Sequence, residues 1–360
     1  MTKARDLANF LGDNTSLGTI NDAYDAGTLV PSSTNPSLII NGDMRISQRQ
    51  TSSTTSGFVL DRFFVGSQGG TRTRSQEAIT SGAPYDLGFR NCLKFTNTVA
   101  GGNNTTDYVE SYYKIESQDV ATSGWNYTSP SSYITVSFWV RSSVAGTYTF
   151  WTRCEDANAN TYAFTYTLAA NTWTKVTHSI PGHSNLVFNN DNGAGLRMQW
   201  IPFYGSGHTS SSATINAWST GSSLPDQSTA WNTTTGATFE LTGVKLEEGS
   251  EATDFQHTSY AEELAKCQRY YETGRSSSTG YGAAGTGFFG CMVDYKAEKR
   301  ATATLTQSSQ SYFAVDGNAI YLGSVGLSYT LNDTNGFYHC AVHDNVNCKY
   351  VFTYTADAEI

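Results

Sequence analysis

Two tryptophans and two arginines at alternating positions form the most distinctive candidate binding pattern in this sequence. Apolar and polar residues alternate with a period of two in segment 133–153, so we expect two short strands joined by a turn. One face is then apolar, and the other bears Trp139, Arg141, Trp151 and Arg153. If the two strands pair as a hairpin, the tryptophans become diagonal neighbours.

Such a face suits the binding of a saccharide. Indole rings offer apolar area to sugar C–H groups, and guanidiniums donate forked hydrogen bonds to hydroxyls or carboxylates. Trp218 and Trp231 flank loops rich in Gly, Ser and Thr, and they are further candidates for a glycan site at a loop end. The alternative for these two is that each only anchors its own loop. The alternative is that another layer or a second subunit covers the aromatic face, in which case these tryptophans are core residues.

The elements that must position these residues are β-strands. Between residues 37 and 257, short alternating segments follow one another, separated by turn-rich breaks. The last of these strands ends near Glu247, and no helical periodicity interrupts the series. The pattern is typical of an antiparallel sandwich and not of βαβ units. We therefore predict an all-β fold in which residues 37–257 form a jelly-roll β-sandwich.

A short helix is expected after the sandwich, within residues 258–273. Ser259 stands three residues before Glu262, which is the capping-box spacing, Glu262 can pair with Lys266, and Gly274 can close the C-terminus. An apolar stripe follows the helix, made of Tyr260, Leu264, Cys267 and Tyr271. This stripe suits an interdomain contact or a bundle of identical copies, such as a trimer.

A second, smaller β domain is predicted over residues 274–360. It begins with a Gly- and Ser-rich loop, 274–287, whose residues are too small and polar to pack, and then returns to short strands. Its core would be slender, so association with other copies would stabilise it.

Residues 1–36 are predicted to be an N-terminal attachment segment. Small and apolar residues share one helical face near its start, namely Ala4, Leu7, Ala8 and Leu11. A helix this short is marginal alone and needs a partner surface. The alternative is a frayed tail.

The overall charge excludes several classes of partner. Charged residues make up only 15% of the chain, the net charge is -9, and no run of Lys or Arg could follow a phosphate backbone, so nucleic-acid binding is not expected. No apolar stretch approaches the roughly 18 residues of a membrane span, and the N-terminus lacks an apolar signal-peptide core. We therefore expect no membrane insertion and assembly in a cytosol.

No catalytic or metal motif stands out. There is no nucleophile elbow, HExxH motif or phosphate-binding loop. His339, Cys340, His343 and Cys348 lie close in sequence, but Cys340 and His343 point to opposite faces of a strand. We predict no enzyme activity, no metal and no cofactor. A glycosidase needs only two acids, however, and the acids nearest to the aromatic segment are Glu110, Glu116, Asp119, Glu155 and Asp156.

Four stretches resemble a group of bacteriophage tail-fibre and virion surface proteins. They are NGDMRISQR at 41–49, LDRF at 60–63, LTGVKLEEGSEATDF with ELAKCQRYYE between 241 and 272, and TADAEI at 355–360. The resemblance implies a virion structural protein with a jelly roll like that of carbohydrate-binding modules. Such jelly rolls often hold calcium through an acid after the opening NG and an Asp pair in the closing strand. Here Asp43 is present, but Arg45 stands near the usual place of a second acid and the closing strand has no Asp, so the sequence leaves calcium binding open.

The resemblance leads to three hypotheses. In the first, the chain is a trimeric tail fibre or adhesin in the virion, assembled in the host cytoplasm, that docks on other virion proteins through residues 1–36 and binds host surface polysaccharide. In the second, it is a structural decoration, head-fibre or tail-adaptor protein. In the third, the sandwich hydrolyses glycan as a depolymerase.

Overall fold

The computed structural model describes residues 35–156, 160–221, 224–225, 230–280, 287–314, 320–321, 328–343 and 348–360. Ser37–Ala252 and His257–Ile360 form one compact unit. The predicted attachment segment lies outside the described residues, apart from Asn35 and Pro36.

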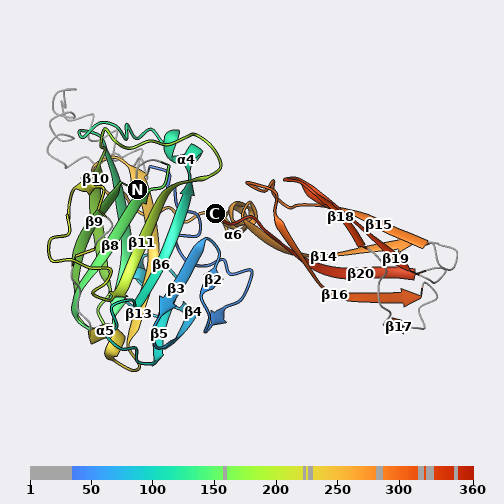
Figure 1. Ribbon diagram of the computed structural model, residues 1–360, viewed down its shortest axis with the longest axis horizontal. Coiled ribbons are helices and arrows are strands. Elements are labelled where there is room, and N and C mark those ends of the chain that lie inside the picture. Colours follow the sequence, from blue (N-terminus) through green and yellow to red (C-terminus); the bar gives the residue numbers. More distant parts are fainter. Residues whose placement is uncertain are drawn as a thin grey trace, which may run out of the picture. The chain divides into compact units, whose positions relative to one another are not determined.

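The first part of this unit is a sandwich of two antiparallel sheets, so the all-β prediction is confirmed (Figure 1). The six-stranded sheet has the order β1 (Ser52–Ser53), β4 (Thr71–Ala78), β5 (Asn91–Val99), β13 (Thr238–Glu248), β7 (Tyr133–Ser142) and β10 (Thr174–Pro181). The seven-stranded sheet has the order β12 (Trp218–Ser219), β9 (Thr161–Leu168), β8 (Gly146–Cys154), β11 (Ala194–Tyr204), β6 (Tyr108–Glu116), β3 (Phe63–Gln68) and β2 (Gly57–Leu60).

The core lies between the two sheets and follows from the alternation in each strand. In β7 the apolar residues at alternate positions point into the core, and Phe138 among them is fully buried. Its ring lies 6.0 Å from that of Phe150 in β8 and 5.9 Å from that of Trp200 in β11. Each such side chain contributes roughly 1.5–3 kcal/mol by leaving water, so this aromatic contact ties the sheets together.

The predicted hairpin of residues 133–153 is wrong. Strands β7 and β8 are consecutive but belong to different sheets, so the chain crosses the sandwich between them. The crossing lets the apolar faces of both strands meet across the core, whereas a hairpin would place both faces on one sheet. As a result Trp139 and Trp151 are not diagonal neighbours and lie on opposite outer faces.

Short helices and a pair of small sheets complete the described chain. The helices are α3 (Ala83–Asp86), α4 (Ser117–Ala121), α5 (Ala230–Thr233) and α6 (Tyr260–Gln268). One small sheet has the order β14 (Tyr271–Gly280), β20 (Cys348–Asp357), β16 (Thr304–Ala314) and β17 (Ile320–Tyr321). The other has the order β15 (Gly287–Asp294), β19 (Gly336–His343) and β18 (Ser328–Asn332). These strands share a second core that includes Phe337, Phe352 and Tyr354.

Helix α6 begins as predicted but ends earlier. The side chain of Ser259 accepts a hydrogen bond from the backbone N–H of Glu262 at 3.2 Å, and Lys266 pairs with Glu262 at 3.1 Å. The helix ends at Gln268, and Tyr271 already belongs to β14, so the expectation that Gly274 closes the helix is wrong.

Strand β14 also corrects the predicted loop at 274–287. It pairs in register with β20 from Tyr271 opposite Asp357 to Gly280 opposite Cys348. Backbone hydrogen bonds of this ladder hold the small residues in an extended strand. Gly274 is needed because a Cβ there would lie 2.5 Å from the ring of Tyr354. Residues 281–286 of the predicted loop lie outside the described part of the chain.

The four stretches that carry the family resemblance converge on α6 and the start of β14. The guanidinium of Arg62 pairs with Glu359 and lies 3.4 Å from the ring centre of Tyr270. Arg49 lies 3.6 Å from the ring centre of Tyr271 and 3.1 Å from Asp357. We call this group, together with Glu116 and Arg269, the junction network.

Glu116, at the end of β6, anchors the network. Its carboxylate is fully buried and accepts hydrogen bonds from Arg269 at 2.8 and 2.9 Å and from the hydroxyl of Tyr270 at 2.6 Å. Burial opposes the charge, but the hydrogen bonds from Arg269 and Tyr270 outweigh it and lower the pKa of Glu116. The carboxylate therefore stabilises the folded state in its charged form.

Replacement of Glu116 by Gln is expected to lower the free energy of unfolding by about 2–4 kcal/mol, because Arg269 loses its buried partner. Denaturant titration measures this loss. The advantage of wild type is present above the unfolded carboxyl pKa and disappears as pH falls through the lower folded pKa.

The matched control is Glu262→Gln on the exposed face of α6, where Glu262 pairs with Lys266. An exposed pair of this kind contributes only about 0.3–0.5 kcal/mol. Equal losses in the two variants would contradict the anchoring role of Glu116.

Candidate functional site

A pocket opens on the outer face of the seven-stranded sheet. Its volume is about 260 Å³. Its lining comes from β6, β8, β9, β11 and the segments that follow β11 and β12, namely Tyr108, Glu110, Trp151, Arg153, Thr161, Arg197, Gln199, Tyr204, His208 and Leu224. We call it the outer-sheet pocket. It is a little smaller than the roughly 300–1,000 Å³ of drug-sized ligand sites, which suits one sugar residue of a chain.

The floor of the pocket is apolar. Trp151 points outward from β8 because alternate residues of a strand face opposite sides of the sheet, and it lies opposite Ala163 of β9 and Gln199 of β11. It is 8% exposed and packs with Ala163, Ile201 and Leu224 in a cluster separate from the main core. These contacts hold the indole in one orientation beneath the pocket.

Three half-buried rings form one side of the pocket. A register shift in β11 between Trp200 and Phe203 brings Tyr204 opposite Tyr108 of β6. The ring of Tyr204 lies 6.0 Å from Tyr108 and 5.1 Å from His208. The edge-to-face arrangement of the tyrosines leaves ring surface at the rim of the pocket.

Glu110 holds the polar side of the pocket in place. Its Oε2 accepts hydrogen bonds from Gln199 Nε2 and from the hydroxyl of Tyr204. Its Oε1 lies 3.5 Å from Nη2 of Arg197. Burial, together with the negative charge of Glu110, raises the pKa of Tyr204 well above its ordinary value. Tyr204 therefore stays a neutral hydrogen-bond donor at any physiological pH.

Two guanidiniums complete the lining. Arg153 lies 3.4 Å from Glu155 through Nε and is 37% exposed, and Arg197 is 23% exposed. Apart from these long contacts with Glu155 and Glu110, no hydrogen bond to either guanidinium is found among the described residues. Both guanidiniums are partly exposed and line the pocket, and Nε of Arg197 is buried without a hydrogen-bond partner among the described residues.

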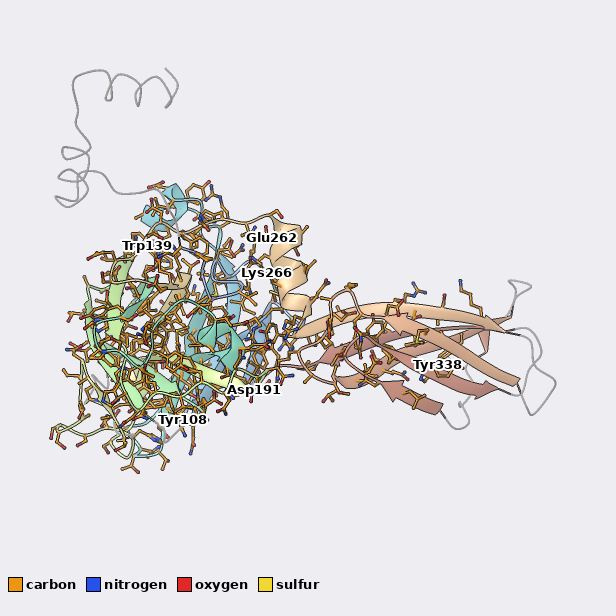
Figure 2. The ribbon with its side chains drawn as sticks, turned by 90° about the horizontal axis from the view of Figure 1, so that it is seen from above. Tyr108, Trp139, Asp191, Glu262, Lys266 and Tyr338 are labelled. Carbon is orange, nitrogen blue, oxygen red and sulfur yellow. The ribbon has the colours of Figure 1, made fainter. Side chains whose placement is uncertain are left out.

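The structure separates the six sequence candidates for glycan binding into three groups. Trp151 and Arg153 line the outer-sheet pocket. Trp139 and Arg141 lie on the outer face of the other sheet, and Figure 2 shows Trp139 and the pocket residue Tyr108 toward opposite sides of the sandwich. Arg141 pairs with Glu240 through both Nε and Nη2 and lies 4.8 Å from the ring of Trp173, so its guanidinium is already engaged.

The other two candidates lie away from both faces. Trp231 is 1% exposed, belongs to the main core and donates from its indole to the carbonyl of Thr238 at 3.0 Å. Trp218 is half-buried at the edge of the seven-stranded sheet, where its indole donates to Pro181 O at 2.6 Å. Trp231 is therefore a core residue with no ring face for a sugar.

Sequence analysis missed most of the pocket. Tyr108, Arg197, Gln199 and Tyr204 were not among the candidates, although Arg197 and Gln199 stand at alternate positions of β11 and therefore share one face. The alternation shows which side chains point outward, but it does not show that β8, β11 and β6 are neighbours. That adjacency brings the pocket together.

The described residues contain no group of three or more His, Cys, Asp and Glu side chains that could hold a metal ion. His339 instead hydrogen bonds to Gln307 at 2.8 Å and Tyr350 at 3.1 Å. Asp43 forms an ion pair with Arg45 at 2.8 Å. In the same part of the chain, no helix is both long and apolar enough to cross a membrane.

No protein-family model and no curated protein matches this chain. Among solved structures, the enzymatically active domain of tailspike protein 4 of bacteriophage CBA120 is similar at 10% identity and a TM-score of 0.34, over 59% of this chain and 21% of that chain. A family 11 carbohydrate-binding module from a Clostridium thermocellum cellulase is similar at 14% identity and a TM-score of 0.28, over 56% and 97% of the two chains. Likenesses this distant carry no argument about function.

Replacement of Glu110 by Gln is expected to let Tyr204 ionise at lower pH. The carboxylate no longer repels the phenolate, so the pKa of Tyr204 falls toward its ordinary value. Alkaline titration of phenolate absorbance measures the shift. The control is the same substitution in a Tyr204→Phe background, where no shift is expected. An equal shift in that background would contradict the assignment.

Proposed function

We propose that this chain is a virion surface protein that binds a cell-surface glycan in the outer-sheet pocket. The observation that carries the proposal is the lining of that pocket, where Trp151, Tyr108 and Arg153 border one cavity. Sugar rings have apolar C–H faces that pack on aromatic rings and hydroxyls that accept hydrogen bonds from guanidiniums. The lining is complementary to both.

The lining favours binding over hydrolysis. Glycosidases generally use two carboxyl groups about 5–10 Å apart. Among the described lining residues, Glu110 is the one carboxylate, and both of its oxygens already contact neighbouring side chains. We therefore propose reversible adhesion and no chemical step.

A virion role is proposed from the four stretches that resemble tail-fibre and virion surface proteins. In this role residues 1–36 dock on other virion proteins, and copies of the chain associate, as in a trimer. Display of several weak sites on one particle then raises the effective concentration for each further contact, so the particle adheres firmly.

The predicted apolar stripe of Tyr260, Leu264, Cys267 and Tyr271 offers fewer contacts for such association than the sequence suggested. Cys267 is fully buried, and Tyr271 is covered by Arg49. Both residues are thus used within the chain. Tyr260 is 58% exposed and Leu264 is half-buried, so these two remain accessible for a neighbouring copy.

The pocket is tested by the double variant Arg153→Ala, Tyr108→Ala. Binding of the purified full chain to host cells and to a glycan array is expected to fall at least tenfold, or about 1.4 kcal/mol, because a donor and a stacking surface are lost. Both side chains are partly exposed, so we expect the fold to persist.

The matched control is Trp139→Ala, Arg141→Ala on the opposite face, which should leave binding within twofold of wild type. Loss of binding only in this control would place recognition on the six-stranded sheet. Absence of binding by wild type to any host cell or glycan would contradict the adhesin proposal and favour a purely structural surface protein.

A further inference from the structure

The charges around the outer-sheet pocket point to the class of sugar. We propose that the pocket selects an acidic sugar residue whose charged group is a carboxylate, such as a uronic acid, over neutral sugars. This inference rests on the proposed glycan-binding function and specifies its ligand.

Three cations stand in one row across the centre of the seven-stranded sheet. Arg197 of β11 lies directly opposite Arg153 of β8 on one side and directly opposite Lys114 of β6 on the other. We call these three residues the cationic row. Like charges at directly opposite positions of neighbouring strands destabilise a sheet. The chain thus keeps a repulsive arrangement here although its net charge is -9.

The carboxylates next to the row do not neutralise it. Glu155 lies 3.4 Å from Arg153, and Glu110 lies 3.5 Å from Arg197. Glu110 is shared, because its other oxygen accepts hydrogen bonds from Gln199 and Tyr204. Three cations against two carboxylates leave one positive charge. Burial, followed by the charge of Arg197, lowers the pKa of Lys114, and the charge of Glu155 opposes this shift.

Aromatic stacking holds Arg197 in position. Its guanidinium lies 4.3 Å from the ring centre of Tyr112, and that ring stacks on Phe64 at 4.5 Å. The guanidinium is therefore supported on one side by a ring and not by a saturating set of hydrogen bonds. A planar fork held in this way loses little side-chain entropy when it binds an anion.

The residues next to the cationic row on the same face of the sheet supply the contact with the sugar ring. Gln199 lies between Trp151 and Tyr112 in the ladder, two residues along the strand from Arg197 and on the same face of the sheet. A sugar ring over Trp151 and Gln199 would thus place a substituent over Arg153 and Arg197. A carboxylate matches the guanidinium fork and carries one negative charge, which equals the excess of the row, whereas a phosphate carries about 1.5–2.

The test measures binding of the full chain to polygalacturonate, alginate and hyaluronan, each compared with its carboxyl-reduced neutral form. At least one acidic polymer should bind ten times more tightly than its neutral form. In Arg197→Gln this ratio should fall to about one, while the melting temperature stays the same or rises because a like-charge contact is removed.

Lys175→Gln is the matched control, because Lys175 is exposed on β10 of the other sheet and its loss changes the net charge equally. It should keep the wild-type ratio. Equal binding to acidic and neutral forms overturns the acidic preference and leaves the glycan-binding proposal standing. Stronger competition by galactose 6-phosphate than by galacturonate overturns the choice of carboxylate. No binding to any polymer overturns both proposals.

Discussion

The structure depends on the pairing of charges buried where the sandwich, α6 and β14 meet. Arg62 is 3% exposed and Glu116 is fully buried, and a buried charge without a partner costs several kcal/mol. Their partners, Glu359 and Arg269, come from distant parts of the chain. The same strand that ends in Glu116, β6, carries Tyr108 and Glu110 of the outer-sheet pocket, and Arg62 donates to the backbone carbonyl of Lys114 near the end of that strand. The junction network thus fixes the strand on which the pocket is built.

The two outer faces of the sandwich differ in how their arginines are used. On the six-stranded sheet, Arg141 forms an ion pair with Glu240, and its guanidinium lies over the ring of Trp173. Its charge is therefore neutralised within the protein. On the seven-stranded sheet, Arg153 and Arg197 lie opposite each other with longer contacts to carboxylates. The two Trp–Arg pairs look alike in sequence but differ in how their arginines are paired.

Much of the fold could be predicted from the sequence because side-chain direction in a strand is a local property. Strands β6 and β9 begin and end where the alternation indicates, and Ser259 caps α6 as its spacing with Glu262 suggests. Strand pairing is a long-range property that alternation within a strand does not report. For this reason the predicted hairpin of β7 and β8 was wrong, and the sequence did not show which strands neighbour β11. Strand β14 was missed because its Gly and Ser residues show no alternation of apolar and polar side chains. Its extended conformation depends on the backbone pairing with β20.

The most direct test of the account is to follow the indole N–H signals of the seven tryptophans by nuclear magnetic resonance while a glycan that binds the chain is titrated in. Assignment uses single Trp→Phe variants. We expect the Trp151 signal to move, because it lies in the floor of the pocket, and the signals of Trp139 and Trp231 to stay in place. A shift of Trp139 with Trp151 unchanged would contradict the account and place the glycan on the opposite face of the sandwich.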